Sequence, residues 1–479
     1  MYNRSVEPYL IDEPEKNIYQ DKIERGIEME REKLGSRLGF ILLSAGCAIG
    51  IGNVWKFPYM VGQNGGGAFV LVYVFFLIAL GVPVMTMEFA MGRASRKSIT
   101  KMYQEIEPKG SKWHLHGYLG LAGNYLLMMF YTVVTGWMLY YFVGMVSGKF
   151  VGADTSRVNE LFAEMMSSPG SLIGCMAITV LIGFGVCAMG LQKGIEKITK
   201  FMMLALLAIM VILAVNSMFL EGGAEGLEFY LIPDFGRMQE IGIGNVIVGA
   251  MNQAFFTLSI GMGSMAIFGS YIGKERSLMG EAVNVAILDT FVAFTSGLII
   301  FPACFAYGVQ PDSGTSLIFK TLPNIFNNIP LGRLWGSLFF VFMSFAALST
   351  IFAVFENIIS CNMDLFGWSR KKACAINAPL MFLLSIPACL GPNLWKSFQP
   401  LGPGSDVSSL EDFLVSNILL PLGSLIFVLF CVTRYGWGWD KFMAEANEGK
   451  GLKVAKWMRG YMTFVLPVLI LVLFVMGII

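Results

Sequence analysis

Charged residues are scarce in this chain of 479 residues: Asp, Glu, Lys and Arg make up only 14% of it, whereas 55% is hydrophobic. A soluble protein needs a polar surface, for which about a quarter of its residues are usually charged. The 34 basic and 33 acidic residues nearly cancel. They form no basic block, so a nucleic acid is not an expected partner. The composition therefore excludes a set of ordinary soluble domains.

Histidine is nearly absent, with only His114 and His116, both of which we expect in a polar loop. The eight cysteines lie almost entirely inside apolar runs, without the spacing of a zinc site or of a disulfide framework. No general base, nucleophile or cofactor loop emerges from the sequence. These shortages disfavour an enzyme.

Long apolar runs, by contrast, are abundant. About 20 apolar residues in a helix cross the ~30 Å of hydrocarbon in a bilayer. Eleven such runs are predicted, at roughly 37–61, 68–91, 118–147, 171–190, 197–219, 241–271, 282–308, 334–363, 374–391, 410–433 and 458–479. The preceding arm, 1–36, is highly charged and has no apolar core, so we expect a cytoplasmic segment rather than a signal peptide.

The basic residues predict the orientation of the chain. Of the 34, 27 fall in the arm or in loops on its side of the membrane, and six fall in the opposite loops. Loops rich in Lys and Arg stay in the cytoplasm. We therefore expect a multi-pass protein of the plasma (inner) membrane with a cytoplasmic N-terminus and, because eleven is odd, an extracytoplasmic C-terminus.

Two of the runs are interrupted by glycines: the first by Gly46-Cys-Ala-Ile-Gly-Ile-Gly-Asn53 and the sixth by Thr257-Leu-Ser-Ile-Gly-Met-Gly-Ser264. They open two consecutive halves of five spans, and an odd number makes the second half an inverted repeat. Unwound backbone at membrane depth is tolerated only where it lines a cavity, and paired broken helices are typical of a transporter binding site. Glycine-mediated helix packing is the alternative.

The predicted fold is thus an all-α polytopic membrane protein with eleven transmembrane helices. Its parts are the arm at 1–36, a first inverted repeat at 37–219, a second at 241–433 and one extra C-terminal helix at 458–479.

Several motifs also resemble a known family. They are Arg37-Leu-Gly-Phe-Ile, Gly50-Ile-Gly-Asn-Val-Trp-Lys-Phe-Pro-Tyr59, Asn64-Gly-Gly-Gly-Ala-Phe69, Glu88-Phe-Ala-Met-Gly-Arg93 and Phe255-Phe-Thr-Leu-Ser-Ile-Gly-Met-Gly263. Together they resemble the neurotransmitter:sodium symporter family, in particular bacterial amino-acid members with the leucine-transporter fold. The resemblance implies alternating access, in which spans 1, 2, 6 and 7 rock against spans 3, 4, 8 and 9.

The resemblance implies two sodium sites built from oxygen ligands, as a hard cation requires. The first would use the Ala48 carbonyl and the side chains of Asn53, Thr257 and Asp289. The second would use the carbonyls of Gly46, Ile49 and Ala346 and the hydroxyls of Ser349 and Thr350. Alone, Ser349 and Thr350 would be interpreted as hydroxyls bonded to their own helix.

The resemblance also implies the substrate contacts, which comprise Cys47, Ala48, Ile51, Gly52, Leu127, Tyr131, Phe256, Thr257, Ser259, Met262, Thr350 and Val354. Tyr131 and the amides of Ile51 and Gly52 would hold the substrate carboxylate. Taken alone, Tyr131 would be a packing residue.

Substitutions within these motifs predict the substrate class. Gly50 stands where monoamine carriers of the family place an acidic residue, so we infer an α-amino acid that brings its own carboxylate. The side-chain subsite carries no charge, and burying an ionic group there would be costly. Met262 is flexible, so a neutral, hydrophobic or aromatic side chain is expected.

Asp289 predicts independence from chloride. A carboxylate inside a span is costly and usually marks function, and chloride-dependent relatives place Asn here with Ser four residues on, where this chain has Ala293. A fixed negative charge would replace the anion, although Tyr73 and Gln253, which resemble other parts of a chloride site, remain. A structural pairing of Asp289 is the alternative. We interpret Glu88 and Glu356 as hydrogen-bonding groups of the bundle.

The gates follow from the same resemblance. Lys56 and Asp412 resemble the outer charged pair, and Arg31 and Asp364 the inner pair. In span 5 this chain has Leu204 where the family commonly has a proline, which predicts a different route for inward sodium release.

We therefore predict a sodium-coupled symporter of a neutral amino acid with two sodium ions and no chloride, in a lipid bilayer, as a monomer or weak dimer. A non-transporting amino-acid sensor or receptor and a proton-coupled carrier, with Asp289 or Glu356 titrating, are the alternatives.

Overall fold

A computed structural model describes residues 34–308, 317–327 and 329–478, and in these ranges the chain is helical, with two isolated backbone bridges and no strand. Nine helical segments in the described residues are long and apolar enough to cross a membrane. They are Gly67–Ser95 (α4, η2, α5), Leu115–Ser147 (α7), Pro169–Ala188 (α9), Leu191–Met218 (η3, α10), Leu278–Ala306 (α15), Gly332–Phe366 (α17), Arg370–Leu390 (α18), Val407–Val432 (α19, η5, α20) and Met458–Ile478 (α22, η6, α23). The predicted all-α membrane fold is confirmed.

The first span is broken, as predicted. Helix α2 (Arg37–Ala48) ends at the glycine-rich segment, and a π-helical turn, η1 (Gly52–Lys56), leads into α3 (Phe57–Gln63) at an angle of 54° to α2. Residues 49 and 50 belong to no helix. Counted as one span, this pair gives ten.

The sixth predicted span is also broken. Helices α13 (Ile243–Thr257) and α14 (Ser264–Tyr271) are separated by residues 258–263, where Ser259, Gly261 and Gly263 all have positive φ angles. Ser259 at φ 50° is notable because non-glycine residues rarely adopt this region. Neither helix alone is long enough to span a bilayer, so the total of eleven spans remains a prediction.

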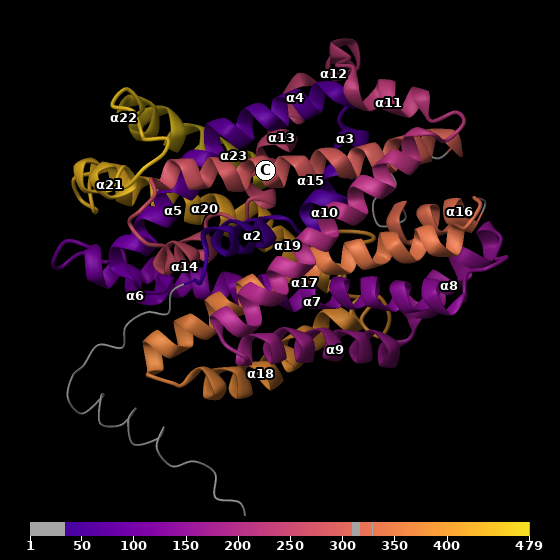
Figure 1. Ribbon diagram of the computed structural model, residues 1–479, viewed down its shortest axis with the longest axis horizontal. Helices are drawn as coiled ribbons and strands as arrows, with labels where there is room; N and C mark the ends of the chain where they lie inside the picture. The colour runs from indigo at the N-terminus through magenta and orange to yellow at the C-terminus, as the bar shows by residue number, and fades with distance from the viewer. Residues whose placement is uncertain (1–33, 309–316, 328, 479) are drawn as a thin grey trace, which may run out of the picture. The chain divides into compact units, whose positions relative to one another are not determined.

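The remaining helical segments are short. They are α6 (Ile99–Ile106), α8 (Thr155–Ser167), α11 (Ala224–Leu231), α12 (Phe235–Ile241), η4 (Leu317–Thr321), α16 (Leu322–Asn327) and α21 (Trp439–Ala446). In Figure 1, α6 and α21 lie toward one end of the long helices, and α8, α11, α12 and α16 lie toward the other. The short helices therefore flank the region of the long ones.

The long helices pack in two groups. In one, α7, α9, α17 and α18 contact one another. In the other, α4 packs on α13, α5 on α14 and α15, and α15 on α2. Helix α2 also packs on α17, so it lies at the junction of the two groups (Figure 1). This is the division into spans 1, 2, 6 and 7 and spans 3, 4, 8 and 9 that the family resemblance implies.

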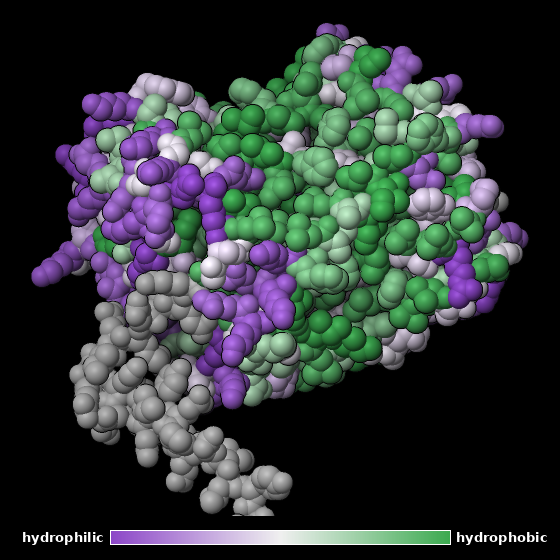
Figure 2. All heavy atoms as spheres, viewed as in Figure 1, coloured by the Kyte–Doolittle hydropathy of each residue, from purple (hydrophilic) through white to green (hydrophobic). Residues whose placement is uncertain are grey.

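The outer surface of the long helices is apolar. Figure 2 shows hydrophobic residues across the middle of the visible face and hydrophilic residues gathered toward both ends. Large exposed side chains on these helices include Phe75, Leu181, Phe201, Ile287, Leu383 and Phe464. Such a continuous apolar surface marks contact with lipid.

Two details differ from, or refine, the sequence-based expectations. His116 does not lie in a polar loop: α7 begins at Leu115, and the buried His116 ring lies 2.7 Å from the Tyr103 hydroxyl. His114 precedes the helix, with Nδ1 2.7 Å from Glu107. Leu204 lies half-exposed in the unbroken helix α10 (Lys197–Met218), which follows the π-helical segment η3 (Leu191–Glu196).

Helices α5 (Val82–Ser95) and α14 approach so closely that only glycine fits between them. A Cβ on Gly92 would lie 1.8 Å from the Ala266 carbonyl oxygen, which is backbone and cannot rotate away. We expect Gly92→Ala to destabilise the protein by about 1–3 kcal/mol, because overpacking forces the backbone to shift. Thermal unfolding in detergent would measure this as a lower melting temperature.

Gly185→Ala is the matched control. Gly185 also lies inside a helix, α9, but nothing lies within 4 Å of an added Cβ. This variant should unfold at or slightly above the wild-type temperature. Equal melting temperatures for the two variants would contradict the close packing of α5 on α14.

Candidate functional site

The site begins with the carbonyl groups at the end of α2. The last carbonyl groups of any helix lack hydrogen-bond donors within the helix. Here, side chains from other spans provide those donors. The Thr350 hydroxyl lies 3.2 Å from the Gly46 carbonyl oxygen and 3.4 Å from those of Cys47 and Ile49, and Ser259 donates to Cys47 O at 3.1 Å. Spans 1, 6 and 8 therefore meet at the break.

Tyr131 of α7 lies on the other side of the same break. The Ile51 amide donates to its hydroxyl at 3.0 Å. A Cβ on Gly50 would lie 2.3 Å from this hydroxyl oxygen and 2.5 Å from Thr350 Oγ1. The arrangement accommodates glycine at position 50 and leaves no room there for an acidic side chain.

The break between α13 and α14 is likewise held by buried polar groups. Glu88 of α5 accepts a hydrogen bond from the Gly261 amide at 2.5 Å, and Asn124 of α7 donates to the Met262 carbonyl at 2.9 Å. A Cβ on Gly261 would lie 2.3 Å from the Leu420 carbonyl oxygen. These contacts fix the unwound segment against three neighbouring helices.

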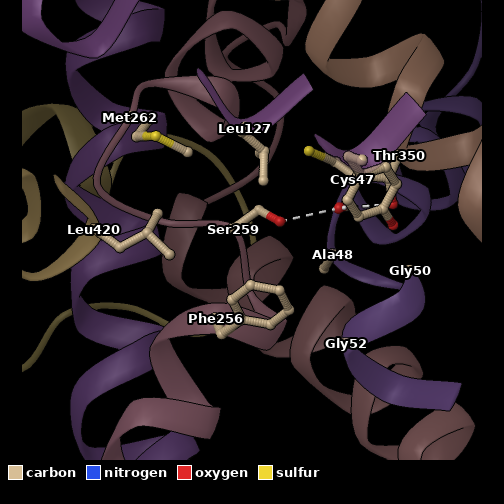
Figure 3. A pocket seen from close by; sticks show the side chains of 11 residues that line it. Cys47, Ala48, Gly50, Gly52, Leu127, Phe256, Ser259, Met262, Thr350 and Leu420 are labelled. Atoms are coloured by element: carbon tan, nitrogen blue, oxygen red, sulfur yellow. Dashed lines mark hydrogen bonds between the residues drawn. The ribbon is translucent and has the colours of Figure 1, made fainter. Parts of the chain in front are cut away.

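A cavity lies between the two breaks and contains about 350 Å³ of space free of protein atoms. It is lined by Cys47, Ala48, Gly50, Gly52, Leu127, Tyr131, Phe256, Ser259, Met262, Thr350 and Leu420. Figure 3 shows Leu127, Ser259 and Phe256 facing the unwound backbone of the first span.

Nine of the twelve predicted substrate contacts line this cavity, and three do not. Ile51 lines a second, outer cavity, Thr257 contacts Asp289, and Val354 is buried in α17. Gly50 and Leu420 line the cavity in addition. Leu420 begins α20 after the π-helical segment η5 (Leu414–Leu419), and one more leucine in an apolar run gives no signal in the sequence.

The lining of the cavity is neutral. It carries no charged side chain but contains two hydroxyl groups from serine and threonine, one phenol, two sulfur atoms and exposed backbone at the first break. Burying an ionic side chain among such groups would be costly. The polar groups gather toward the break of the first span, and the opposite wall is apolar (Figure 3).

One cluster of oxygen atoms joins the first, sixth and seventh spans. Asn53 Nδ2 donates to Asp289 Oδ1 at 2.8 Å, and the Thr257 hydroxyl donates to the same carboxylate at 3.2 Å. The Tyr73 hydroxyl lies 3.4 Å from Asp289 Oδ2. Asp289, Asn53 and Thr257 are all completely buried, so a carboxylate and two further polar side chains converge inside the bundle.

A second cluster joins the first and eighth spans. The Ser349 hydroxyl lies 2.9 Å from the Ala346 carbonyl oxygen and 3.4 Å from that of Ile49, and Thr350 contacts Gly46 O as above. Carbonyl and hydroxyl oxygens are ligands for hard cations. Among the described residues there is no group of three or more His, Cys, Asp or Glu side chains that could hold a metal ion.

An outer cavity of about 1050 Å³ lies on the other side of Phe256 and Tyr131, which line both cavities. Lys56 Nζ lies 3.7 Å from Asp412 Oδ2 across this outer cavity and 3.8 Å from the centre of the Phe256 ring. The pair is partly exposed, and such pairs are weak. Phe256 and Tyr131 therefore lie between the two cavities, and the Lys56–Asp412 pair lines the outer one.

The inner charged pair is only half described. Asp364 accepts a hydrogen bond from the Ser98 amide at 2.7 Å. Its predicted partner, Arg31, lies outside the described residues. Glu356 pairs with Arg370 and accepts from Tyr271, which agrees with a hydrogen-bonding role in the bundle.

Known proteins resemble this chain over most of its length. Residues 31–154 and 154–479 match the sodium:neurotransmitter symporter family. An uncharacterised sodium-dependent transporter, YhdH of Bacillus subtilis, is 34% identical over 93% of this chain and 98% of its own, and one from Haemophilus influenzae is 33% identical with the same coverage.

A solved structure is also similar. The crystal structure of MhsT in complex with L-phenylalanine has a TM-score of 0.84 and 36% identity, covering 93% of this chain and all of that chain. With two broken helices, a small cavity between them and matches over nearly the whole sequence, the chain belongs to the sodium:neurotransmitter symporter family, whose members are transporters and not enzymes.

Proposed function

We propose that the protein is a sodium-coupled symporter that imports a neutral, hydrophobic or aromatic L-amino acid by alternating access and without chloride. The observation that carries this proposal is the cavity between the two broken helices, which has polar backbone and hydroxyls on one side and a neutral, largely apolar wall on the other. An amino acid has the same division between its charged backbone groups and its side chain.

The substrate would bind with its carboxylate toward the first break. Tyr131, which already contacts the Ile51 amide, and the backbone at Gly52 would hold that carboxylate, and Cys47, Leu127, Phe256, Ser259 and Met262 would surround the side chain. L-Phenylalanine, which is bound by the similar protein MhsT, is therefore the first substrate to test.

Sodium would bind at the two oxygen clusters. The first ion would lie among the Ala48 carbonyl, Asn53, Thr257 and Asp289, next to the substrate carboxylate. The second would lie among Gly46, Ile49, Ala346, Ser349 and Thr350. Both sets use carbonyls of the unwound first span, which couples ion binding to the shape of that span.

Two ions would supply ample energy for uptake. With a tenfold gradient (~1.4 kcal/mol per ion) and 100 mV (~2.3 kcal/mol per charge), two sodium ions provide about 7.4 kcal/mol. For a neutral amino acid this supports roughly 10⁵-fold accumulation. A single ion would halve the exponent.

Alternating access would use the two groups of helices as moving parts. The outer cavity would give the external route, closed by Lys56, Asp412 and Phe256 above the substrate. The bias of basic residues predicts a cytoplasmic N-terminus and an external C-terminus. In this orientation Asp364 and Arg31 would form the inner gate, and α2 would move with the group of spans 1, 2, 6 and 7 against α17.

Labelled L-phenylalanine uptake into proteoliposomes tests this proposal. With an inward sodium gradient we expect accumulation above the external concentration, because the ion gradient drives uphill movement. Replacing sodium by choline at constant pH should reduce uptake to the level of empty vesicles. Undiminished uptake in choline would instead support a proton-coupled carrier, and binding without accumulation would support a sensor.

A panel of twenty unlabelled amino acids serves as the control for specificity. Large neutral amino acids should compete best with the labelled substrate because the cavity wall is apolar and uncharged. If charged or very small amino acids competed best, the assignment of the Cys47, Ser259 and Met262 subsite would be wrong.

The Asp289 carboxylate supports independence from chloride. The Tyr73 hydroxyl, which resembles a chloride ligand, already donates to Asp289. We expect the double variant Asp289→Asn, Ala293→Ser to lose about tenfold or more of its sodium-driven uptake in gluconate, because the charged acceptor is gone. Chloride should restore part of the uptake of this variant. Uptake by the wild type should be the same in chloride as in gluconate.

Asp440→Asn provides the matched control, since Asp440 is an exposed aspartate of α21, outside the cavity lining and both oxygen clusters. Its uptake should equal that of the wild type in both anions. Wild-type uptake that rises with chloride would refute the role given to Asp289.

A further inference from the structure

A further pocket lies at the end of the bundle where α2 and α15 begin. It is separate from the proposed substrate and sodium sites. It contains about 500 Å³ of space, and its lining includes Arg37, Arg276, Glu281, Val283, Lys450 and Leu452. These residues come from the start of α2, the start of α15 and the loop after α21. The pocket therefore lies between three segments that are distant in the sequence.

The pocket is positively charged. Arg37 is paired with Glu281, with its Nε 3.0 Å from Oε1. Arg276 and Lys450 are exposed, and within the described residues their side chains have no ion pair or hydrogen bond. Three cations face one carboxylate, so the lining has a net charge of +2.

Backbone contacts hold the two unpaired cations side by side. Arg276 and Lys450 form an isolated bridge, in which the Lys450 amide donates to Glu275 O at 2.9 Å and the Ser277 amide donates to Lys450 O at 3.1 Å. Like charges on paired backbone repel each other. An anion bound between these side chains would remove that repulsion.

The nearby acidic side chains do not neutralise these two cations. Glu448 pairs with Lys274 at 2.9 Å, and Glu445 pairs with the buried Arg93 at 2.6 Å. The Glu275 carboxylate lies against Gly273. The positive charge at Arg276 and Lys450 is also close to the N-terminus of the 29-residue helix α15, whose dipole favours anions.

The buried carboxylate of Glu281 sets a second requirement for a ligand that binds in this pocket. The Glu281 side chain is 2% exposed, and while Oε1 accepts from Arg37, Oε2 has no hydrogen-bond partner among the described residues. A buried carboxylate oxygen without a donor is costly. A ligand that fits the whole pocket therefore combines an anionic group with a hydrogen-bond donor.

An exposed apolar strip of α15 begins at the pocket. Val283 lies in the pocket, and Ile287 and Phe291 follow at intervals of four residues, which places them on the same side of the helix. Ile287 is 61% and Phe291 43% exposed, and Leu452, which also lines the pocket, is 53% exposed. An apolar strip thus continues from the charged pocket toward the membrane interior.

We propose that this pocket binds the headgroup of an anionic glycerophospholipid of the phosphatidylglycerol type. The phosphate lies between Arg276 and Lys450, a glycerol hydroxyl donates to Glu281 Oε2, and an acyl chain follows Val283, Ile287 and Phe291. Basic pockets at the membrane surface recognise anionic headgroups in this way. The bound lipid would connect the start of α2, the moving half of the first span, to α15.

Thermal unfolding of the full-length protein in detergent, titrated with dioctanoyl phosphatidylglycerol, tests the proposal. We expect a saturable rise in melting temperature, because a ligand that binds the folded state stabilises it. The variant Arg276→Gln, Lys450→Gln keeps the backbone bridge and should raise the Kd about 30-fold, as two surface cations are lost. Dioctanoyl phosphatidylcholine should give no saturable rise.

Three controls make the result specific. Lys193→Gln, Lys371→Gln removes two exposed cations at the same end of the bundle but outside the pocket and should leave the Kd unchanged. Dioctanoyl phosphatidylmethanol has the same charge but no hydroxyl, and should bind about tenfold more weakly if Glu281 accepts a hydrogen bond. Inorganic phosphate alone should not stabilise the protein.

The proposal is overturned if phosphatidylglycerol gives no saturable rise, or if the control pair weakens binding as much as the pocket pair. Stabilisation by inorganic phosphate equal to that by the lipid would overturn the assignment to a lipid. Equal binding of phosphatidylglycerol and phosphatidylmethanol would overturn the role of Glu281.

Discussion

The structure depends on the need to satisfy unwound backbone inside an apolar bundle. A helix that stops at membrane depth leaves carbonyl and amide groups that lipid cannot bond. The first span stops after Ala48, and the sixth stops at Thr257. Hydroxyls of Thr350, Ser349 and Tyr131 and the carboxylate of Glu88 contact the freed groups. The same freed groups supply the polar lining of the cavity, so the cost of the break and the ability to bind a ligand have one origin.

This constraint also explains why the proposed ion and substrate sites are inseparable. The Gly46 and Ile49 carbonyls belong to the second oxygen cluster, and the intervening Cys47 and Ala48 line the cavity. Asn53 accepts from the Gly50 amide at 3.2 Å and donates to Asp289. A change in the position of the first span would therefore alter both oxygen clusters and the cavity together, as coupled transport would require.

Sequence reasoning worked best where a pattern had only one structural solution. Glycine clusters at 46–53 and 257–264 predicted both breaks, because few other arrangements place so many glycines in two apolar runs at matching positions. Leu420 was missed, since nothing distinguishes it from its apolar neighbours. His116 was misplaced because α7 begins earlier than its hydropathy suggests. The pocket at Arg276 and Lys450 joins loops about 170 residues apart, and only the folded chain shows that these charges are neighbours.

The central claim is that amino acid and sodium share one binding unit, built on the broken first span. Equilibrium titration of the purified protein tests this claim most directly: the Kd of L-phenylalanine measured with and without saturating sodium, and the sodium affinity measured with and without saturating L-phenylalanine. Because coupling between two sites is reciprocal, the account predicts that each ligand raises the affinity of the other, and by the same factor. An amino-acid Kd that does not change between sodium and choline would contradict it.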